Sequence, residues 1–102
     1  MPTVKITVLR KMANQDLVDE FCEADVVVPC PRFTEGQEFI VVEGGRKPED
    51  FCDAAWHDIH KSYRVIRHGG NFEGWMKGDG TIIACCSDGL RPVVFELKRI
   101  SD

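Results

Sequence analysis

The stretch from residue 48 to 69 restricts the fold most, because it combines an apolar stripe with signals for both ends of a helix. Pro48 suits the first helical position, and the acidic Glu49 and Asp50 complement the positive end of the helix dipole. Gly69 can adopt the left-handed conformation that ends a helix. Between these ends, apolar side chains recur at three- and four-residue spacing: Phe51, Cys52, Ala55, Trp56, Ile59, Tyr63 and Ile66. The stripe predicts one main helix with a face to bury.

Four other segments have the pattern of strands. Residues 3–9 alternate between apolar and polar side chains, which is typical of a half-buried strand. Residues 37–42 follow Gly36 and end at a Gly44-Gly45 turn. Residues 81–86 and 92–100 form a predicted hairpin through Ser87, Asp88 and Gly89, with Gly89 at a positive φ angle. The sequence therefore predicts an α+β fold, in which a small antiparallel or mixed sheet, able to curl into a partial barrel, packs on the main helix.

The sequence predicts a single domain, residues 1–102, in which short connections join the elements named above. A chain of this length has room for one domain. Asn14 can cap a short helix that runs to Phe21, because its side chain can accept hydrogen bonds from the first turn. Pro29 and Pro31 flank Cys30, which excludes a helix there and imposes an extended loop.

Charge and hydrophobicity exclude several classes of partner. The chain has 13 Lys and Arg against 17 Asp and Glu, a net charge of −4, so we expect no nucleic-acid partner. Its longest apolar runs are far shorter than the roughly 20 residues that cross a membrane. Lys5 interrupts the N-terminal apolar segment, which a secretory signal peptide would need unbroken for about 7–15 residues. We therefore expect a cytoplasmic protein without a membrane partner.

Five cysteines are the main candidates for chemistry. Their number is odd, so they cannot all form internal disulfides. In a reducing compartment such thiols are buried, bound to metal or reactive. Cys52 lies in the first predicted helical turn, where the helix dipole favours a thiolate, although a buried cysteine also packs as a small apolar residue. Cys85 and Cys86 are neighbours in a predicted strand, so their side chains should face opposite ways, and a disulfide between them would be strained and labile.

The leading hypothesis from the sequence is a thiol-centred site for metal binding or thiol redox chemistry. The candidate catalytic groups are Cys52, Cys86, Asp88 and Arg91. In the metal version, a zinc or iron ion would bind side chains that the fold must gather from separate segments, because no Cys-x-x-Cys motif occurs. That predicted ligand set is Cys30, Cys52, Cys85, Cys86 and His57.

Two other functions stay open from the sequence, and they leave undecided whether the chain is an enzyme. It could be a non-enzymatic binding or assembly module that forms a homodimer through its last strand, because Pro92 near the start of that strand suits a sheet edge. It could also be a small acid/base enzyme that uses Asp88, Arg91 and His57, since an imidazole titrates near neutral pH. The alternative interpretation of Asp88 is that it only stabilises the hairpin turn.

Three motifs are distributed along the chain: PCPxF with GQEF at residues 29–39, FCxxAWxDI at residues 51–59 and CCxDGxRPVxF at residues 85–95. Together they resemble a family of small, uncharacterised prokaryotic cysteine-rich proteins of similar length. The resemblance implies that the whole chain is one domain. It implies no activity, substrate or cofactor.

Overall fold

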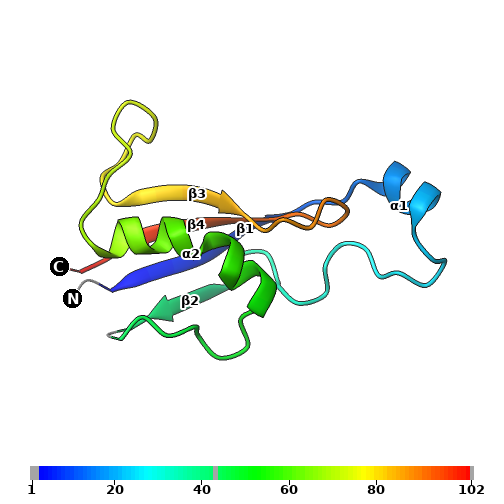
Figure 1. The fold of residues 1–102 in the computed structure, drawn as a ribbon, viewed down its shortest axis with the longest axis horizontal. Helices are drawn as coiled ribbons and strands as arrows, with labels where there is room; N and C mark the ends of the chain where they lie inside the picture. Colours follow the sequence, from blue (N-terminus) through cyan, green and yellow to red (C-terminus); the bar gives the residue numbers. More distant parts are fainter. Residues whose placement is uncertain (1–2, 43, 102) are drawn as a thin grey trace.

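The computed structural model describes residues 3–42 and 44–101, and it has the predicted α+β architecture (Figure 1). Positions 1, 2, 43 and 102 of the predicted domain lie outside the described residues. The elements follow in the order β1 (Val4–Lys11), α1 (Gln15–Phe21), β2 (Glu38–Val41), α2 (Asp53–Arg67), β3 (Thr81–Cys85) and β4 (Val93–Arg99).

The four strands form one open antiparallel sheet in the order β2-β1-β4-β3. The sheet is open, with β2 at one end of this order and β3 at the other. The last strand, β4, lies between β1 and β3, so the prediction that it forms an edge was wrong. Pro92 precedes β4, and its missing N–H is therefore not needed within the strand. The edges of the sheet are β2 and β3.

Helix α2 covers one face of the sheet with the predicted apolar stripe. Its buried residues Ala55, Ile59, Tyr63 and Ile66 lie in the same hydrophobic cluster as the inward residues of the strands. The helix begins later than predicted, at Asp53. Residues 48–51 form a turn instead, in which the N–H of Phe51 donates to the carbonyl of Pro48. Because Asp50 has a φ of 64°, it cannot continue a right-handed helix.

Four phenylalanines from four separate segments fill the centre of the core. Phe33 comes from the loop before β2, Phe39 from β2, Phe51 from the turn before α2 and Phe95 from β4. The ring of Phe33 meets the rings of the other three at centroid distances of 5.9, 5.1 and 5.2 Å, all in edge-to-face geometry. This cluster joins the sheet, α2 and the loop into one body.

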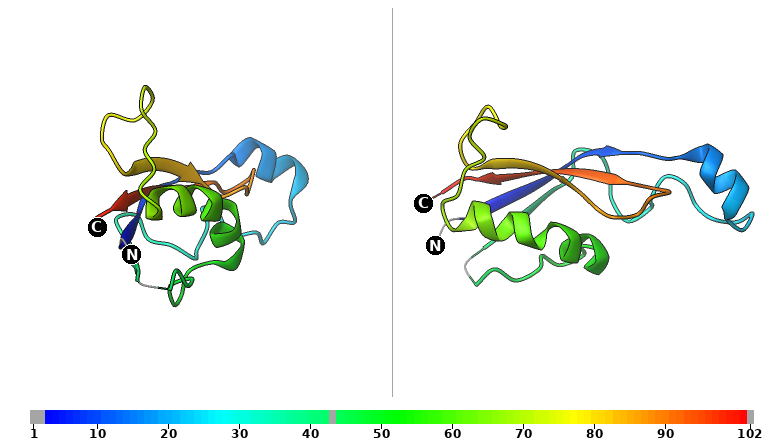
Figure 2. Two further views of the ribbon diagram at one scale, coloured as in Figure 1. Left: turned by 60° about the vertical axis from the view of Figure 1, so that its left-hand side comes forward. Right: turned by 45° about the horizontal axis from the view of Figure 1, so that its top comes forward.

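An arm, defined here as residues 12–29, extends from one end of this body. It contains α1 and gives the molecule its long axis, with extents of 47 × 31 × 21 Å (Figures 1 and 2). Val18 is the buried residue of α1, and within the described chain no other helix or strand packs against this helix. The backbone N–H of Asn14 donates to the carbonyl of Leu90, and the Asn14 side chain donates to the carbonyl of Gly89.

Neither helix in the described ranges is both long enough and apolar enough to cross a membrane.

Candidate functional site

A cavity of about 290 Å³ opens where the start of α2, the end of β3 and the loop before β2 meet. We call it the thiol pocket, because cysteines from three separate segments line it. Its lining consists of Cys30, Arg32, Phe33, Cys52, Ala54, Ala55, Asp58, Cys86, Ser87, Asp88, Arg91 and Val93. The fold therefore brings together three of the predicted thiols and both residues of the predicted Asp88 and Arg91 pair.

Cys52 occupies the N-cap position of α2. Its backbone is extended, with φ of −63° and ψ of 128°, and its carbonyl accepts the first helical hydrogen bond from the N–H of Trp56 at 2.9 Å. Within the described chain the Cys52 side chain makes no capping hydrogen bond, so the thiol remains available to the pocket. The positive end of a helix dipole favours negative charge at this position.

The carboxylate of Asp53, which stands next to Cys52, is balanced by a lysine. Lys47 Nζ lies 2.9 Å from Asp53 Oδ1. This hydrogen bond and the positive charge of Lys47 lower the pKa of the Asp53 carboxyl. The negative charge that would oppose a thiolate at the start of α2 therefore has its own counter-ion.

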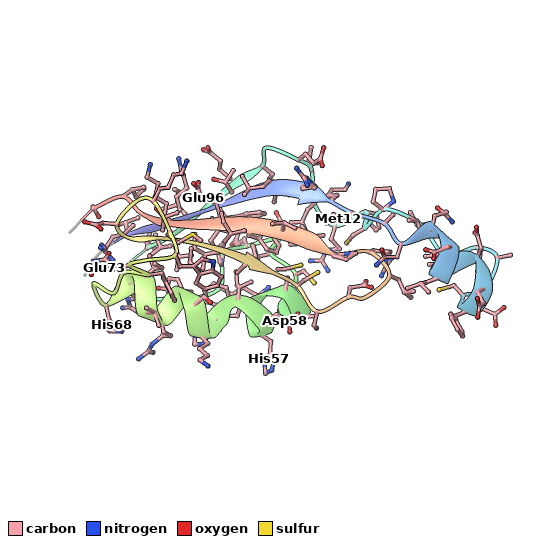
Figure 3. All side chains as sticks on the ribbon, turned by 90° about the horizontal axis from the view of Figure 1, so that it is seen from above. Met12, His57, Asp58, His68, Glu73 and Glu96 are labelled. Carbon is pink, nitrogen blue, oxygen red and sulfur yellow. The ribbon has the colours of Figure 1, made fainter. Side chains whose placement is uncertain are left out.

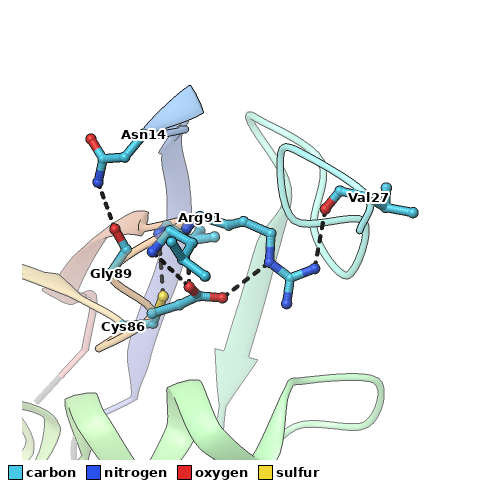
Figure 4. Close-up of polar contacts among 8 residues, drawn as sticks. Asn14, Val27, Cys86, Gly89 and Arg91 are labelled. Carbon is cyan, nitrogen blue, oxygen red and sulfur yellow. Dashed lines mark hydrogen bonds and ion pairs between the residues drawn. The ribbon is translucent and has the colours of Figure 1, made fainter. Parts of the chain in front are cut away.

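Cys86 leaves the regular part of β3 and turns its thiol into the pocket. Its Sγ accepts a hydrogen bond from the backbone N–H of Val93 at 3.3 Å, and its own N–H donates to the carbonyl of Val93 at 3.1 Å (Figure 4). These two contacts fix the direction of the sulfur. A backbone N–H aimed at sulfur also stabilises that sulfur when it carries negative charge.

Cys85 does not belong to the pocket lining, and its side chain is exposed. The sequence predicted that these neighbouring side chains would face opposite ways; Cys86 lines the pocket and Cys85 does not, but a hydrogen bond between the two thiols keeps them close to each other. Partial burial raises the pKa of the Cys85 thiol, and the neighbouring Cys86 and Asp58 add to the increase. At neutral pH Cys85 is therefore a protonated thiol and a poor nucleophile.

Asp88 and Arg91 close the hairpin turn and attach the arm to it. Asp88 Oδ1 accepts from the backbone N–H of Leu90 at 2.9 Å and of Arg91 at 3.0 Å, and Oδ2 accepts from Arg91 Nε at 3.1 Å. Arg91 also donates to the carbonyl of Val27 in the arm (Figure 4). Asp88 thus stabilises the turn, as one interpretation of the sequence held, but through these acceptor contacts, because Gly89 lacks the expected positive φ.

The two charges of this turn contribute to the electrostatics of the pocket wall, together with Arg32 and Asp58. Partial burial alone would raise the pKa of Asp88, but the hydrogen bonds from Leu90 and Arg91 and the positive charge of Arg91 outweigh it and lower the pKa. Asp88 is therefore ionised at neutral pH and engaged as an acceptor. Such a group is unsuited to general acid/base catalysis, which needs a proton to transfer near the working pH.

His57 lies apart from the thiol pocket. It borders a separate surface hollow with Asp53, Trp56, His60 and Lys61, and Figure 3 shows it projecting from α2 away from the sheet. His57 therefore does not join Asp88 and Arg91 in an acid/base site. Over residues 3–42 and 44–101, no group of three or more His, Cys, Asp or Glu side chains is arranged to hold a metal ion. The predicted metal ligands are not assembled: Cys85 and His57 lie outside the pocket, and the three thiols that line it are not close enough together to form such a group.

Three polar residues of the pocket lining were not among the predicted site residues: Arg32, Asp58 and Ser87. Asp58 Oδ2 accepts from the backbone N–H of Ser87 at 2.7 Å and from its hydroxyl at 2.9 Å. This pair ties α2 to the chain just after Cys86. The sequence did contain a signal for Asp58: its three- and four-residue spacing from residues 55 and 54 places all three on one side of a helix.

Fold and pocket together define a small α+β protein with a cavity lined by three thiols. No family model, no curated protein and no solved structure matches the chain. The function is therefore argued from the pocket itself.

Proposed function

We propose that the chain carries out thiol–disulfide exchange in the thiol pocket. The observation that carries the proposal is that Cys30, Cys52 and Cys86, from three separate segments, line one cavity of about 290 Å³. Apolar residues such as Phe33, Ala55 and Val93 form much of the remaining wall. A pocket of this kind can admit a small disulfide and bring it into contact with more than one thiol.

In the proposed reaction, Cys52 at the start of α2 is the attacking group, and it attacks in its thiolate form as thiol–disulfide exchange requires. It bonds to one sulfur of a substrate disulfide, the substrate S–S bond breaks, and the leaving thiolate takes up a proton. Cys86 then attacks the Cys52 sulfur of the mixed disulfide and releases the second substrate thiol. Two protein thiols are oxidised to one disulfide, and the substrate disulfide is reduced to two thiols.

Asp88 and Arg91 take positioning roles in this proposal. Asp88 holds the Arg91 guanidinium by the hydrogen bond at Nε, and Arg91 borders the same pocket as the thiols. A fixed positive charge there stabilises the thiolate that each exchange step releases. The other pocket arginine, Arg32, adds to the same field.

Metal binding is the weaker version of a thiol-centred site, because the described side chains include no metal-binding group of three. A zinc or iron ion would need ligands to move together from separate places. The exchange chemistry suits a reducing compartment, where cellular thiols regenerate the reduced protein, so we propose a cytoplasmic location. The predicted homodimer rests on a separate surface, described in the next subsection.

The proposal is tested by treating the reduced protein with oxidised glutathione and mapping disulfides by mass spectrometry. We expect a Cys52–Cys86 disulfide in the wild type, glutathione trapped on Cys52 in Cys86→Ser, and neither product in Cys52→Ser. Matched controls are Cys22→Ser and Cys85→Ser, which remove thiols outside the pocket and should leave the Cys52–Cys86 disulfide intact. Modification of all five thiols at equal rates, without a disulfide inside the pocket, would contradict the proposal. Metal analysis of the same sample tests the metal version.

A further inference from the structure

Strand β3 forms one edge of the sheet, and the strand itself has none of the sequence features that usually prevent edge pairing. Its sequence from Thr81 to Cys85 contains no charged residue and no proline. Its pairing with β4 runs through five consecutive residues without a bulge. The loop before β3 rises from the start of the strand on the side away from β4, and the rest of the strand has no helix or strand of the described chain beside it on that side (Figures 1 and 2). Edge strands that must stay single usually carry lysine, proline or a bulge.

The hydrogen bonds of β3 determine which backbone groups point outward. The N–H of Arg99 donates to the carbonyl of Gly80 at 2.8 Å, and the N–H of Cys86 donates to the carbonyl of Val93 at 3.1 Å. In an antiparallel ladder the residues that exchange such bonds alternate along the strand. The backbone groups of Thr81, Ile83 and Cys85 therefore point away from β4, and no backbone partner reaches them within residues 3–42 and 44–101.

We propose that a second copy of this chain pairs with β3, antiparallel and centred on Ile83. The three outward residues are spaced evenly about Ile83, so two copies related by a two-fold axis satisfy one another. Ile83 faces Ile83 of the second copy, and Thr81 faces Cys85 at each end. Each of these three pairs exchanges two N–H···O bonds. The two sheets become one continuous sheet with both copies of α2 on the same side.

The side chains of the outward residues suit this pairing with a second copy. They lie on the sheet face opposite α2, where Ile83 is 41% exposed. Pairing about the two-fold axis brings isoleucine against isoleucine and threonine against cysteine, so no like charges meet. A charged peptide partner would find no matching charge along this edge. The neutrality of the strand and this two-fold register therefore support a second copy as the occupant.

The opposite edge, β2, lacks these properties. It has four residues, of which Glu38 and Ile40 alternate with the buried Phe39 and Val41. Two copies of β2 would bring the charged side chain of Glu38, which is paired with Lys5 on β1, next to the interface. The proposal is therefore specific to β3, and it does not rest on the proposed thiol chemistry.

The first test compares two lysine substitutions on the same sheet face by sedimentation equilibrium in reducing buffer. Wild type should dimerise. Ile83→Lys sets like charges against each other across the two-fold axis and should weaken dimerisation by roughly tenfold or more. Ile40→Lys is the matched control, because Ile40 has a similar exposure of 45% but lies on β2. A wild type that stays monomeric at several hundred micromolar, or equal effects of the two substitutions, would overturn the proposal.

The second test checks the register without disturbing the fold. In a hydrogen-bonded antiparallel pair the Cα atoms lie about 5.5 Å apart, within the roughly 4.4–6.8 Å that a disulfide spans. Thr81→Cys should therefore form a covalent dimer with Cys85 of the second copy under mild oxidation, and adding Cys85→Ser should abolish it. Lys98→Cys, one strand further from the edge, should stay uncross-linked. Absence of the Thr81→Cys dimer, or equal cross-linking of Lys98→Cys, would overturn the centring on Ile83.

Discussion

The body and the arm of this molecule use the same residue types in opposite ways. Four phenylalanines meet in the centre of the body and are nearly inaccessible to solvent, whereas Phe21 in the arm is 72% exposed. In the body, α2 and the sheet both bury apolar side chains where they pack against each other. Helix α1 buries Val18, and among the described elements none packs against it. We infer that the body carries the stability and that the arm depends on it.

The thiol pocket lies where these two regions join. Arg91 of the hairpin holds the carbonyl of Val27 near the end of the arm, and the chain then enters the body through Cys30 and Phe33. One thiol of the pocket therefore depends on how the arm returns, while Cys52 and Cys86 are held by α2 and β3. Of the three pocket thiols, Cys30 is therefore the one whose position depends most on the contacts of the arm.

Removing a central ring from the body should have the largest effect. Phe95 is fully buried on β4 and lies 5.2 Å from the ring of Phe33 and 5.5 Å from that of Phe51. Phe95→Ala should lower the free energy of unfolding by about 3–5 kcal/mol, because it removes apolar contacts and leaves a cavity. Small domains have a total stability of only about 5–15 kcal/mol. Urea unfolding followed by circular dichroism measures the change, and a loss below about 1 kcal/mol would show that the core is packed differently.

Weakening the junction between body and arm should have a smaller effect that depends on pH. Asp88→Asn keeps an oxygen for the backbone N–H groups of Leu90 and Arg91 but removes the charge that holds Arg91 Nε. Since the ion pair is partly exposed, we expect a loss of about 0.5–1 kcal/mol at pH 7. The pKa of Asp88 is lowered in the folded state, so its stabilisation is present above the ordinary value of 3.8 and disappears as the pH falls through the folded pKa.

Urea unfolding at pH 7 and near pH 3 measures this dependence. The difference between wild type and Asp88→Asn should shrink at the lower pH. Asp53→Asn removes a lysine-paired carboxylate outside the junction for comparison; because Asp53 is fully exposed and its pKa is also lowered, its smaller effect should shrink in the same direction as the pH falls. A stability difference for Asp88→Asn that stays constant between the two pH values would show that the carboxylate charge does not hold the junction.

The sequence predicted the elements of the body well because their patterns are local. The three- and four-residue spacing gave α2 its buried face, and alternation located the strands. The start of α2 was misplaced because Pro48, Glu49 and Asp50 suit a helix by propensity, while the chain must first turn to bury Phe51. The strand order could not be read from the residues, because it depends on pairings between distant segments.

The difference between local patterns and pairings of distant segments also explains which parts of the site were predicted. The residue types of the pocket were visible in the sequence, and alternation indicated that Cys85 and Cys86 would separate. Which of the two faces α2 is set by the register of β3 against β4, where Cys85 pairs with Val94 and Cys86 follows with Val93. His57 lies outside the thiol pocket for a similar reason. The turn at Asp50 determines where α2 begins and how it packs on the sheet, and therefore which helix residues face the pocket.

The smallest effect is expected from the same substitution placed in the arm. Phe21→Ala removes a ring of the same size as Phe95→Ala does, but this ring already lies mostly in water, so unfolding hardly changes its exposure. The free energy of unfolding should change by no more than about 0.5 kcal/mol, as for other surface sites. Urea unfolding under the same conditions as for Phe95→Ala makes the comparison direct. A loss above about 2 kcal/mol would contradict the contrast between body and arm, because it would show that Phe21 is buried in solution by the body or by a second molecule. The protein-concentration dependence of that loss would tell these two contacts apart, since only contact with a second molecule follows mass action.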